Sequence, residues 1–173
     1  PVLQGAVSRK NHLAGGLWDI DVGAGDVESR SKELGTTNIS SLTIVATFDI
    51  PVAILGGAAA AQTDVGTVDS VVAGATTDEV IVTVSGLPLF TQVNLTFADT
   101  GVGVVDASCP TDPAYASASA LCLRIIVGDY DNLGRTNFLD FAKIKSAGYL
   151  NQLVNSVDKA RADFDGNSRP NFL

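Results

Sequence analysis

The chain changes character between residues 121 and 148. It contains Leu121-Cys-Leu-Arg-Ile-Ile-Val127, then Asp129-Tyr-Asp-Asn-Leu-Gly-Arg-Thr-Asn-Phe-Leu-Asp140, and then Phe141-Ala-Lys-Ile-Lys-Ser-Ala-Gly148. The first run is rich in branched apolar residues, which favours a β-strand. The second is polar and predicts a loop. From Asn137 onward apolar residues recur at helical intervals, and Gly148 is a typical C-terminal stop. The stretch therefore predicts a change from β to helical structure near residue 128.

Residues 1–127 have the pattern of an antiparallel β-domain. Runs rich in Val, Ile, Thr and Phe alternate with clusters of Gly, Asp, Ser and Asn. Turn signals recur roughly every 10 residues, which is the spacing of a β-sandwich or barrel. We therefore expect a mainly β fold, with an antiparallel β-sandwich of immunoglobulin-like or cohesin-like type in residues 1–127. The expected strands are Leu17–Val22, Ser41–Ile50, Gly66–Val72, Glu79–Ser85, Gln92–Phe97 and Leu121–Val127.

Residues 128–173 predict a small, loop-rich helical module. Asn137–Gly148 is the first expected helix, with Phe138, Phe141 and Ile144 at helical spacing. Tyr149–Ala162 is the second. The residues expected on one face of this second helix are Leu150, Leu153, Val154 and Val157.

Composition excludes several classes of protein. The chain has 173 residues, 46% hydrophobic and 17% charged, which is enough apolar material for a folded core. Its longest nearly uncharged apolar run, Pro51–Ala61, is shorter than the roughly 20 residues of a membrane-spanning helix. The net charge of −8, with no run of basic residues, disfavours nucleic-acid binding.

The negative charge lies upstream of the boundary. Residues 1–127 hold 13 Asp and Glu against 5 Lys and Arg, whereas residues 128–173 hold 6 of each sign. This asymmetry supports a boundary near residue 128.

Two polar loops 34 residues apart carry the clearest chemical signal. The first begins at Asp129 and the second at Asp163. Both have Asp at loop positions 1 and 3, Arg at position 7 and Asn-Phe-Leu at positions 9 to 11. This is the pattern of a Ca²⁺ loop, in which side-chain oxygens and one backbone carbonyl surround a hard cation.

The expected Ca²⁺ ligands follow from that pattern. In the first loop they are Asp129, Asp131, the carbonyl of Arg135, Asn137 through a water molecule, and Asp140. In the second loop they are Asp163, Asp165, Asn167, the carbonyl of Arg169, and Asn171. The first loop departs from the pattern at position 5, where Leu133 offers no side-chain oxygen. The second has Ser168 at position 6, and the sequence stops one residue before position 12.

With this loop spacing, residues 128–173 resemble a dockerin type I module. The resemblance implies a calcium loop plus one helix in each repeat, and a protein partner of the cohesin class. Dockerins carry partner-contacting residues near loop positions 10 and 11. The corresponding residues here are Phe138, Leu139, Phe172 and Leu173.

The upstream region is similar to a β-domain without assigned activity that precedes dockerin-like tails in secreted bacterial proteins. The similarity lies in residues 5–12, 16–22, 27–31 and 42–48. It implies an extracellular setting and adds no chemistry of its own.

The two cysteines, Cys109 and Cys122, bracket a stretch rich in Pro, Ala and Ser. We expect a disulfide that closes this loop, which would place the protein in an oxidising compartment. Two reduced, buried thiols are the alternative.

Other polar residues favour structural roles over catalysis. His12, the single histidine, has Ser8 and Asp19 nearby in sequence, but the chain has no nucleophile-elbow motif. Asp19, Asp21, Asp26 and Glu28 form an acidic cluster. A solvent-facing strand surface explains the cluster best, with a further calcium site or a glycosidase carboxylate pair as alternatives.

Together these features predict a secreted, non-catalytic, calcium-binding protein that works by protein–protein association. Its partner is either a cohesin-like receptor or further copies of the chain, which would build a fibre or surface layer. The alternative is a dockerin-anchored carbohydrate-binding component of a polysaccharide-degrading complex.

Overall fold

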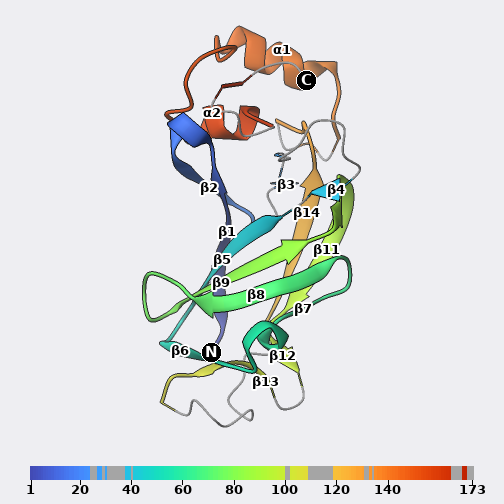
Figure 1. Ribbon diagram of the computed structural model, residues 1–173. Coiled ribbons are helices and arrows are strands. Elements are labelled where there is room, and N and C mark those ends of the chain that lie inside the picture. The colour runs from blue at the N-terminus through green and yellow to red at the C-terminus, as the bar shows by residue number, and fades with distance from the viewer. Residues whose placement is uncertain are drawn as a thin grey trace.

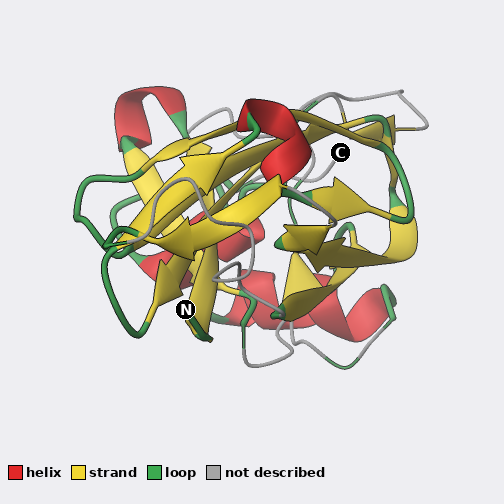
Figure 2. Cartoon of the chain, turned by 90° about the horizontal axis from the view of Figure 1, so that it is seen from below, coloured by secondary structure: helices red, strands yellow, loops and turns green. Residues whose placement is uncertain are grey.

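A computed structural model describes residues 1–23, 27–28, 30, 38–39, 41–99, 102–108, 119–130, 133, 135–164 and 169–170. The chain is mainly β, with 46% strand, antiparallel sheets and two small α-helices in the described part. Strands dominate the view in Figure 2. Figure 1 places both α-helices at one end of the sheets, far from the N-terminus. Within the described ranges no helix combines the length and apolar character needed to cross a membrane.

The largest sheet has five strands in the order β2-β1-β5-β9-β8. Its central strands are rich in Val, Ile and Thr, whose branched side chains pack well on a pleated surface. In β9 burial alternates along the strand, and Val80, Val82 and Val84 all point into the core. The strands are β1 (Leu3–Asn11), β2 (Leu17–Asp21), β5 (Leu42–Phe48), β8 (Thr67–Ala73) and β9 (Glu79–Ser85).

A four-stranded sheet lies in the order β3-β14-β11-β7. Its strands are β3 (Val27–Glu28), β14 (Ala120–Ile126), β11 (Phe90–Thr96) and β7 (Gln62–Thr63). The β14–β3 pair is parallel, and the other strand pairs in the described ranges are antiparallel.

Smaller elements complete the β-region. They are the sheet of β12 (Ala98–Asp99), β13 (Val102–Asp106) and β6 (Val52–Leu55), the pair β10 (Leu87–Pro88) and β4 (Asn38–Ile39), and the 3₁₀ turns η1 (Leu13–Gly15) and η2 (Gly57–Ala60).

The two main sheets share one hydrophobic core. Val93 and Leu95 of β11 and Leu123 of β14 belong to the same buried cluster as the core residues of the five-stranded sheet. Phe48 and Phe97 meet edge to face, with ring centroids 5.4 Å apart. Each fully buried aliphatic side chain stabilises such a core by roughly 1.5–3 kcal/mol.

The expected strands are confirmed to within a few residues, but the long first strand, β1, was not predicted from the sequence. It contains Arg9 and Lys10, and its burial does not follow a strict alternation. It forms because β2 and β5 both pair with it, which is a tertiary effect.

The C-terminal segment contains α1 (Phe138–Ser146) and α2 (Val157–Ala162). The first confirms the predicted helix. The second is far shorter than predicted, because the chain turns at Asn151 with φ of 60° and α2 begins only after its N-cap, Ser156. The expected apolar face of the second helix is therefore wrong, since Val154 is buried while Leu153 and Val157 are exposed.

A small separate core holds this segment together. Ile144, Ala162 and Phe164 are buried in it. Tyr130, Tyr149 and Leu150 are partly buried and pack against it.

Candidate metal centre

The first candidate loop begins where β14 ends. Gly128 adopts φ of 86°, and Thr136 lies so close that a Cβ on Gly128 would stand 2.9 Å from its methyl group. The Thr136 hydroxyl donates to the Val127 carbonyl over 2.6 Å. The end of the loop at Thr136 therefore lies against its beginning at Gly128.

Both ends of this loop carry a fully buried carboxylate. Asp129 at position 1 and Asp140 at position 12 each have 0% exposure. Oδ1 of Asp129 accepts a hydrogen bond from the Leu133 amide over 3.1 Å. A buried carboxylate requires compensation by hydrogen bonds or positive charge. Asp129 and Asp140 each need such compensation inside the protein.

Position 9 and position 12 also cap helix α1. Leu139 N donates to Oδ1 of Asn137, and Asn137 N donates to Oδ2 of Asp140, each over 2.8 Å. This reciprocal capping box satisfies two helix N–H groups. Nδ2 of Asn137 is buried and has no hydrogen-bond partner among the residues that the structure describes. A buried donor of this kind requires an acceptor such as a bridging water.

The other residues of the first loop differ in exposure. Leu133 is 60% exposed, and Arg135 is also exposed. Tyr130 is half-buried, and burial, followed by the negative charge of Asp158, raises the pKa of its phenol to about 12. Tyr130 thus ties the loop to the segment around α2. Asp131 lies outside the described residues.

The described residues fit a hard-cation site in part. Asp129 and Asp140 supply carboxylates, and Asn137 supplies an amide at the water-bridging position. No group of three or more Asp, Glu, His or Cys side chains with metal-binding geometry occurs in the described ranges. A complete Ca²⁺ shell of about 6–8 oxygens would need Asp131 and backbone carbonyls as well.

The second loop is described only at its edges. Asp163 ends α2 and is fully buried, and Phe164 lies in the small core. Arg169 donates from Nη1 to the Asn151 carbonyl over 2.5 Å. The remaining predicted residues, Asp165, Asn167, Asn171, Phe172 and Leu173, lie outside the described residues.

Asp163 is bonded to the β-region. Its Oδ2 lies 2.6 Å from Nδ1 of His12, and both side chains have 0% exposure. Nearby, Nζ of Lys10 donates to the Phe164 carbonyl over 3.2 Å. Gly15, at the tip of the β1–β2 hairpin, approaches so closely that a Cβ there would stand 2.8 Å from Cβ of Val154.

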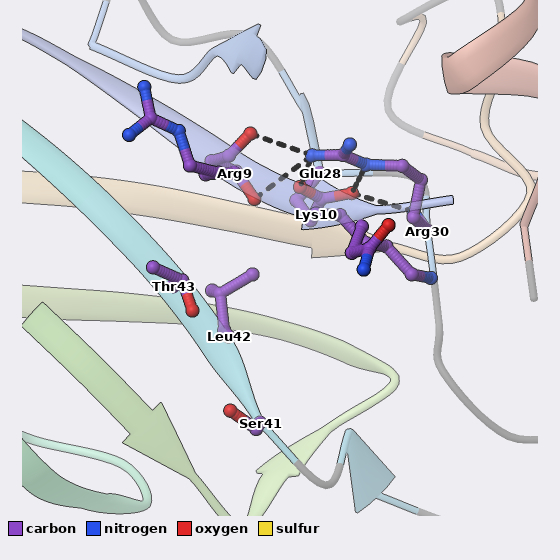
Figure 3. A pocket seen from close by; sticks show the side chains of 9 residues that line it. Arg9, Lys10, Glu28, Arg30, Ser41, Leu42 and Thr43 are labelled. Carbon is purple, nitrogen blue, oxygen red and sulfur yellow. Dashed lines mark hydrogen bonds and ion pairs between the residues drawn. The ribbon is translucent and has the colours of Figure 1, made fainter. Parts of the chain in front are cut away.

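Next to His12, Arg30 and Glu28 form a buried ion pair. Nε and Nη2 of Arg30 donate to the two oxygens of Glu28, each over 2.8 Å. Burial alone would raise the pKa of Glu28, but the charge and hydrogen bonds of Arg30, together with a hydrogen bond from Ser8, outweigh burial and hold that pKa below its ordinary value. Both residues line a pocket of about 200 Å³ beside the start of β5, shown in Figure 3.

The guanidinium of Arg30 is fully engaged. Besides Glu28, it donates from Nη2 to the carbonyl and hydroxyl of Ser8, and from Nη1 to the Trp18 carbonyl. Nη1 also lies 3.2 Å from Nε2 of His12. Both ring nitrogens of His12 are therefore occupied inside the protein.

The other members of the acidic cluster face solvent to differing degrees. Asp19 pairs with Arg9 over 2.7 Å at a part-exposed site, and exposed Asp21 accepts from Gly23 N. This agrees with a strand surface for these two residues. Glu28 differs, since it is buried with Arg30. Asp26 lies outside the described residues.

The predicted partner-contact residues of the first loop are accessible. Phe138 is 81% exposed and Leu139 is 54% exposed. Cys122 is exposed on β14 and forms no disulfide with another described residue. Cys109 lies outside those residues, so the bridge stays a prediction.

Sequence reasoning missed the network of Glu28, Arg30, His12 and Asp163. The only local signal was Glu28 and Arg30 at alternate positions, which is common on strand surfaces. The contact between His12 and Asp163 spans 151 residues, and no spacing rule could have indicated it.

Comparison with known proteins gives no match. No family model, curated protein or solved structure matches the chain.

Proposed function

We propose that this chain is a non-catalytic, calcium-binding interaction protein. Residues 1–127 form a β-sandwich, and residues 128–173 form a dockerin-like module. The observation that carries the proposal is the full burial of Asp129 and Asp140 at the first and last positions of one 12-residue loop. Two buried negative charges in so short a loop favour a bound cation, since opposite charge offsets their desolvation.

Calcium suits the proposed donor set. All the donors are oxygens, which favours Ca²⁺ or Mg²⁺ over softer metals. Asp129, Asp131 and Asp140 would hold the ion together with the Arg135 carbonyl. Asn137 would act through water, with its carboxamide oxygen accepting a hydrogen bond from that water. A bound cation would supply charge neutralisation that keeps the loop folded against α1.

The proposed partner surface lies at the start of α1. Phe138 and Leu139 follow the capping residue Asn137 directly, so the conformation of the loop sets the direction in which they point. A largely exposed aromatic side chain is a typical anchor for a protein partner. We propose a cohesin-like receptor or a further copy of the chain as that partner, in an extracellular setting.

The experiment distinguishes the proposed role of Asp140 in metal binding from its role in capping helix α1. Asp140→Asn keeps a side-chain oxygen that can accept from Asn137 N but removes the charge, and Asp129→Asn does the same for the Leu133 amide. Calorimetric titration of the full chain with Ca²⁺ should show binding that both variants weaken strongly, while helix content by circular dichroism in chelator stays near wild type. Wild-type protein that binds no Ca²⁺ at millimolar concentration would rule out the proposal.

The proposed partner surface is tested with the double variant Phe138→Ser and Leu139→Ser. Both side chains are exposed, so folding should be unaffected. Light scattering with Ca²⁺ and then with chelator tests assembly of copies. Calcium-dependent growth that the double variant abolishes would favour self-association. A monomer under both conditions at high concentration would favour a separate receptor.

A further inference from the structure

A second pocket, of about 450 Å³, lies where the four-stranded sheet meets the end of the first loop. Figure 1 shows β11 and β14 side by side, with β14 leading towards the helical end of the molecule. The volume falls within the range of roughly 300–1,000 Å³ that is typical of small-molecule sites. The described lining consists of residues 90–92 of β11, Arg124 and Ile126 of β14, and Arg135 and Thr136 of the loop.

The strand register puts the β11 and β14 side chains of the pocket on the outer face of the sheet. Gln92 lies opposite Arg124, and Phe90 lies opposite Ile126. Residues directly opposite each other in an antiparallel pair point to the same side. Val93, the next residue of β11, is buried in the core, so its neighbour Gln92 faces away from the core. Phe90 is 66% exposed.

Arg135 comes to this face through the contact that closes the first loop. The hydroxyl of Thr136 donates to the carbonyl of Val127, the residue that follows β14, over 2.6 Å. Arg135, which is exposed, is therefore held near the end of the strand that carries Arg124. Two segments of the chain thus each bring one guanidinium to the same pocket.

The two arginines of this pocket are the described arginines whose guanidinium groups have no ion-pair or hydrogen-bond partner in the described ranges. Salt bridges hold Arg9 and Arg30, Arg169 donates to a backbone carbonyl, and Arg161 is also engaged. The described lining of the pocket contains no acidic residue, although the chain has a net charge of −8. Two uncompensated positive charges at one place in an acidic protein favour an anionic ligand.

The remaining lining narrows the chemistry of that ligand. A guanidinium can hold a carboxylate with two parallel hydrogen bonds. Phe90 offers an apolar face to a flat ring, and the carboxamide of Gln92 offers a donor and an acceptor for hydroxyl groups. A protein partner would need about 800 Å² of contact on each side, which is far more than one pocket of this size provides. A sugar ring that bears a carboxylate matches all of these groups.

We propose that this pocket binds uronic acid units of an acidic polysaccharide. Arg124 and Arg135 hold the carboxylate groups, Phe90 packs against the sugar ring, and Gln92 bonds to its hydroxyls. The proposal goes beyond calcium binding and does not depend on it, because neither Asp129 nor Asp140 lines the pocket.

The first test is calorimetric titration of the full chain with a galacturonic acid trimer. Chelator is present, so that calcium cannot link uronates to the protein. The trimer should bind, and its affinity should fall as salt is added. The neutral galactose trimer is the control ligand and should bind at least about tenfold more weakly, since it lacks the charge-assisted hydrogen bonds. Absence of galacturonate binding at millimolar concentration, or equal binding of the neutral trimer, would overturn the inference.

Variants locate the binding to this pocket. Arg124→Gln and Arg135→Gln should each weaken galacturonate binding about 10–100-fold, because each removes hydrogen bonds to a charged group. Arg9→Gln is the matched control, since it removes the same charge outside the pocket and should leave the affinity unchanged. Urea midpoints near wild type show that the variants fold. Wild-type affinity in both pocket variants would mean that the ligand binds elsewhere, and the inference would be wrong.

A glutamic acid trimer distinguishes a saccharide from an acidic peptide. It should bind at least about tenfold more weakly than the galacturonate, because it offers no ring to Phe90 and no hydroxyls to Gln92. Equal binding that Arg124→Gln weakens to the same extent would assign the pocket to peptide carboxylates and overturn the saccharide proposal. Failure of galacturonate binding leaves the proposed calcium site standing, and failure of calcium binding leaves this pocket standing.

Discussion

The β-region and the C-terminal segment differ in what holds them together. The β-region buries aliphatic side chains from two sheets in one core. The C-terminal segment buries Ile144, Ala162 and Phe164, with three partly buried neighbours. A core of that size rarely stabilises a segment this short by itself, and small domains commonly rely on metals, disulfides or docking to a larger body. The C-terminal segment therefore depends on its polar contacts, whereas the β-region depends on apolar burial.

The largest expected effect comes from breaking the buried ion pair behind the junction. Glu28→Gln leaves the Arg30 charge buried without its partner, and this should destabilise the protein by about 3–5 kcal/mol. Urea unfolding followed by tryptophan fluorescence measures the loss. The matched control is Asp19→Asn, which breaks the part-exposed pair with Arg9 and should cost less than about 1 kcal/mol. Equal losses in the two variants would contradict the buried role of Glu28.

The next prediction compares one substitution in both cores. Ile44 and Ile144 are the same residue type at 0% and 1% exposure. Ile44→Ala should cost about 2–5 kcal/mol, and Ile144→Ala should fall at the low end of that range because its smaller core can relax around the cavity. Denaturant midpoints with and without calcium provide the measurement. Calcium should offset the loss of stability at Ile144 and leave the loss at Ile44 unchanged. The reverse pattern would contradict a calcium dependence of the C-terminal segment.

Acid should weaken the buried ion pair between Glu28 and Arg30. The pKa of Glu28 is lower in the folded protein than in the unfolded chain. Its contribution to stability is therefore complete above the ordinary glutamate pKa, about 4.3, and is lost as the pH falls below that value towards the folded-state pKa. Unfolding free energies between pH 7 and pH 3 should fall less steeply in Glu28→Gln than in wild type. If the unfolding free energy fell equally steeply with pH in wild type and in Glu28→Gln, this contribution of Glu28 would be excluded.

The substitution with the least effect on stability concerns calcium binding by the first loop. Leu133 is 60% exposed at position 5 of the first loop. Leu133→Asp adds a carboxylate where calcium loops place an oxygen ligand, so it should tighten calcium binding with almost no change in stability without calcium. Calorimetry tests the change in calcium affinity, and unfolding curves in chelator test the stability without calcium. Leu133→Ser, which adds a hydroxyl but no charge, is the control and should have a weaker effect on affinity.

The sequence predicted those parts of the fold that local pattern determines. β9 alternates Val with polar or half-buried residues, and its predicted bounds match the structure. α1 carries its own cap in Asn137 and Asp140, so its start was predictable. β1 was missed because its strand conformation comes from pairing with β2 and β5. The second helix was overextended because helical spacing at Leu150 and Leu153 is outweighed by the turn at Asn151.

Some residues of the candidate site could also be predicted from the sequence, whereas others could not. The loop residues Asp129, Asn137 and Asp140 follow a spacing rule and could be selected from sequence alone. His12, Glu28 and Arg30 follow none, since burial brings them to Asp163 from positions more than a hundred residues upstream. The sequence indicated only that His12 has a structural role, and the fold identifies its partners.

The close approach of Gly15 to Val154 limits how this tail can be moved to another protein. Because the hairpin tip leaves no space for even a methyl group there, a host strand pair with any other residue at that position would hold the tail at a distance. The hydrogen bond from a histidine equivalent to His12 would then no longer reach. Protein engineers who want to graft the C-terminal segment would have to transplant the hairpin tip with it, so the transferable unit begins at residue 3 and not at residue 128.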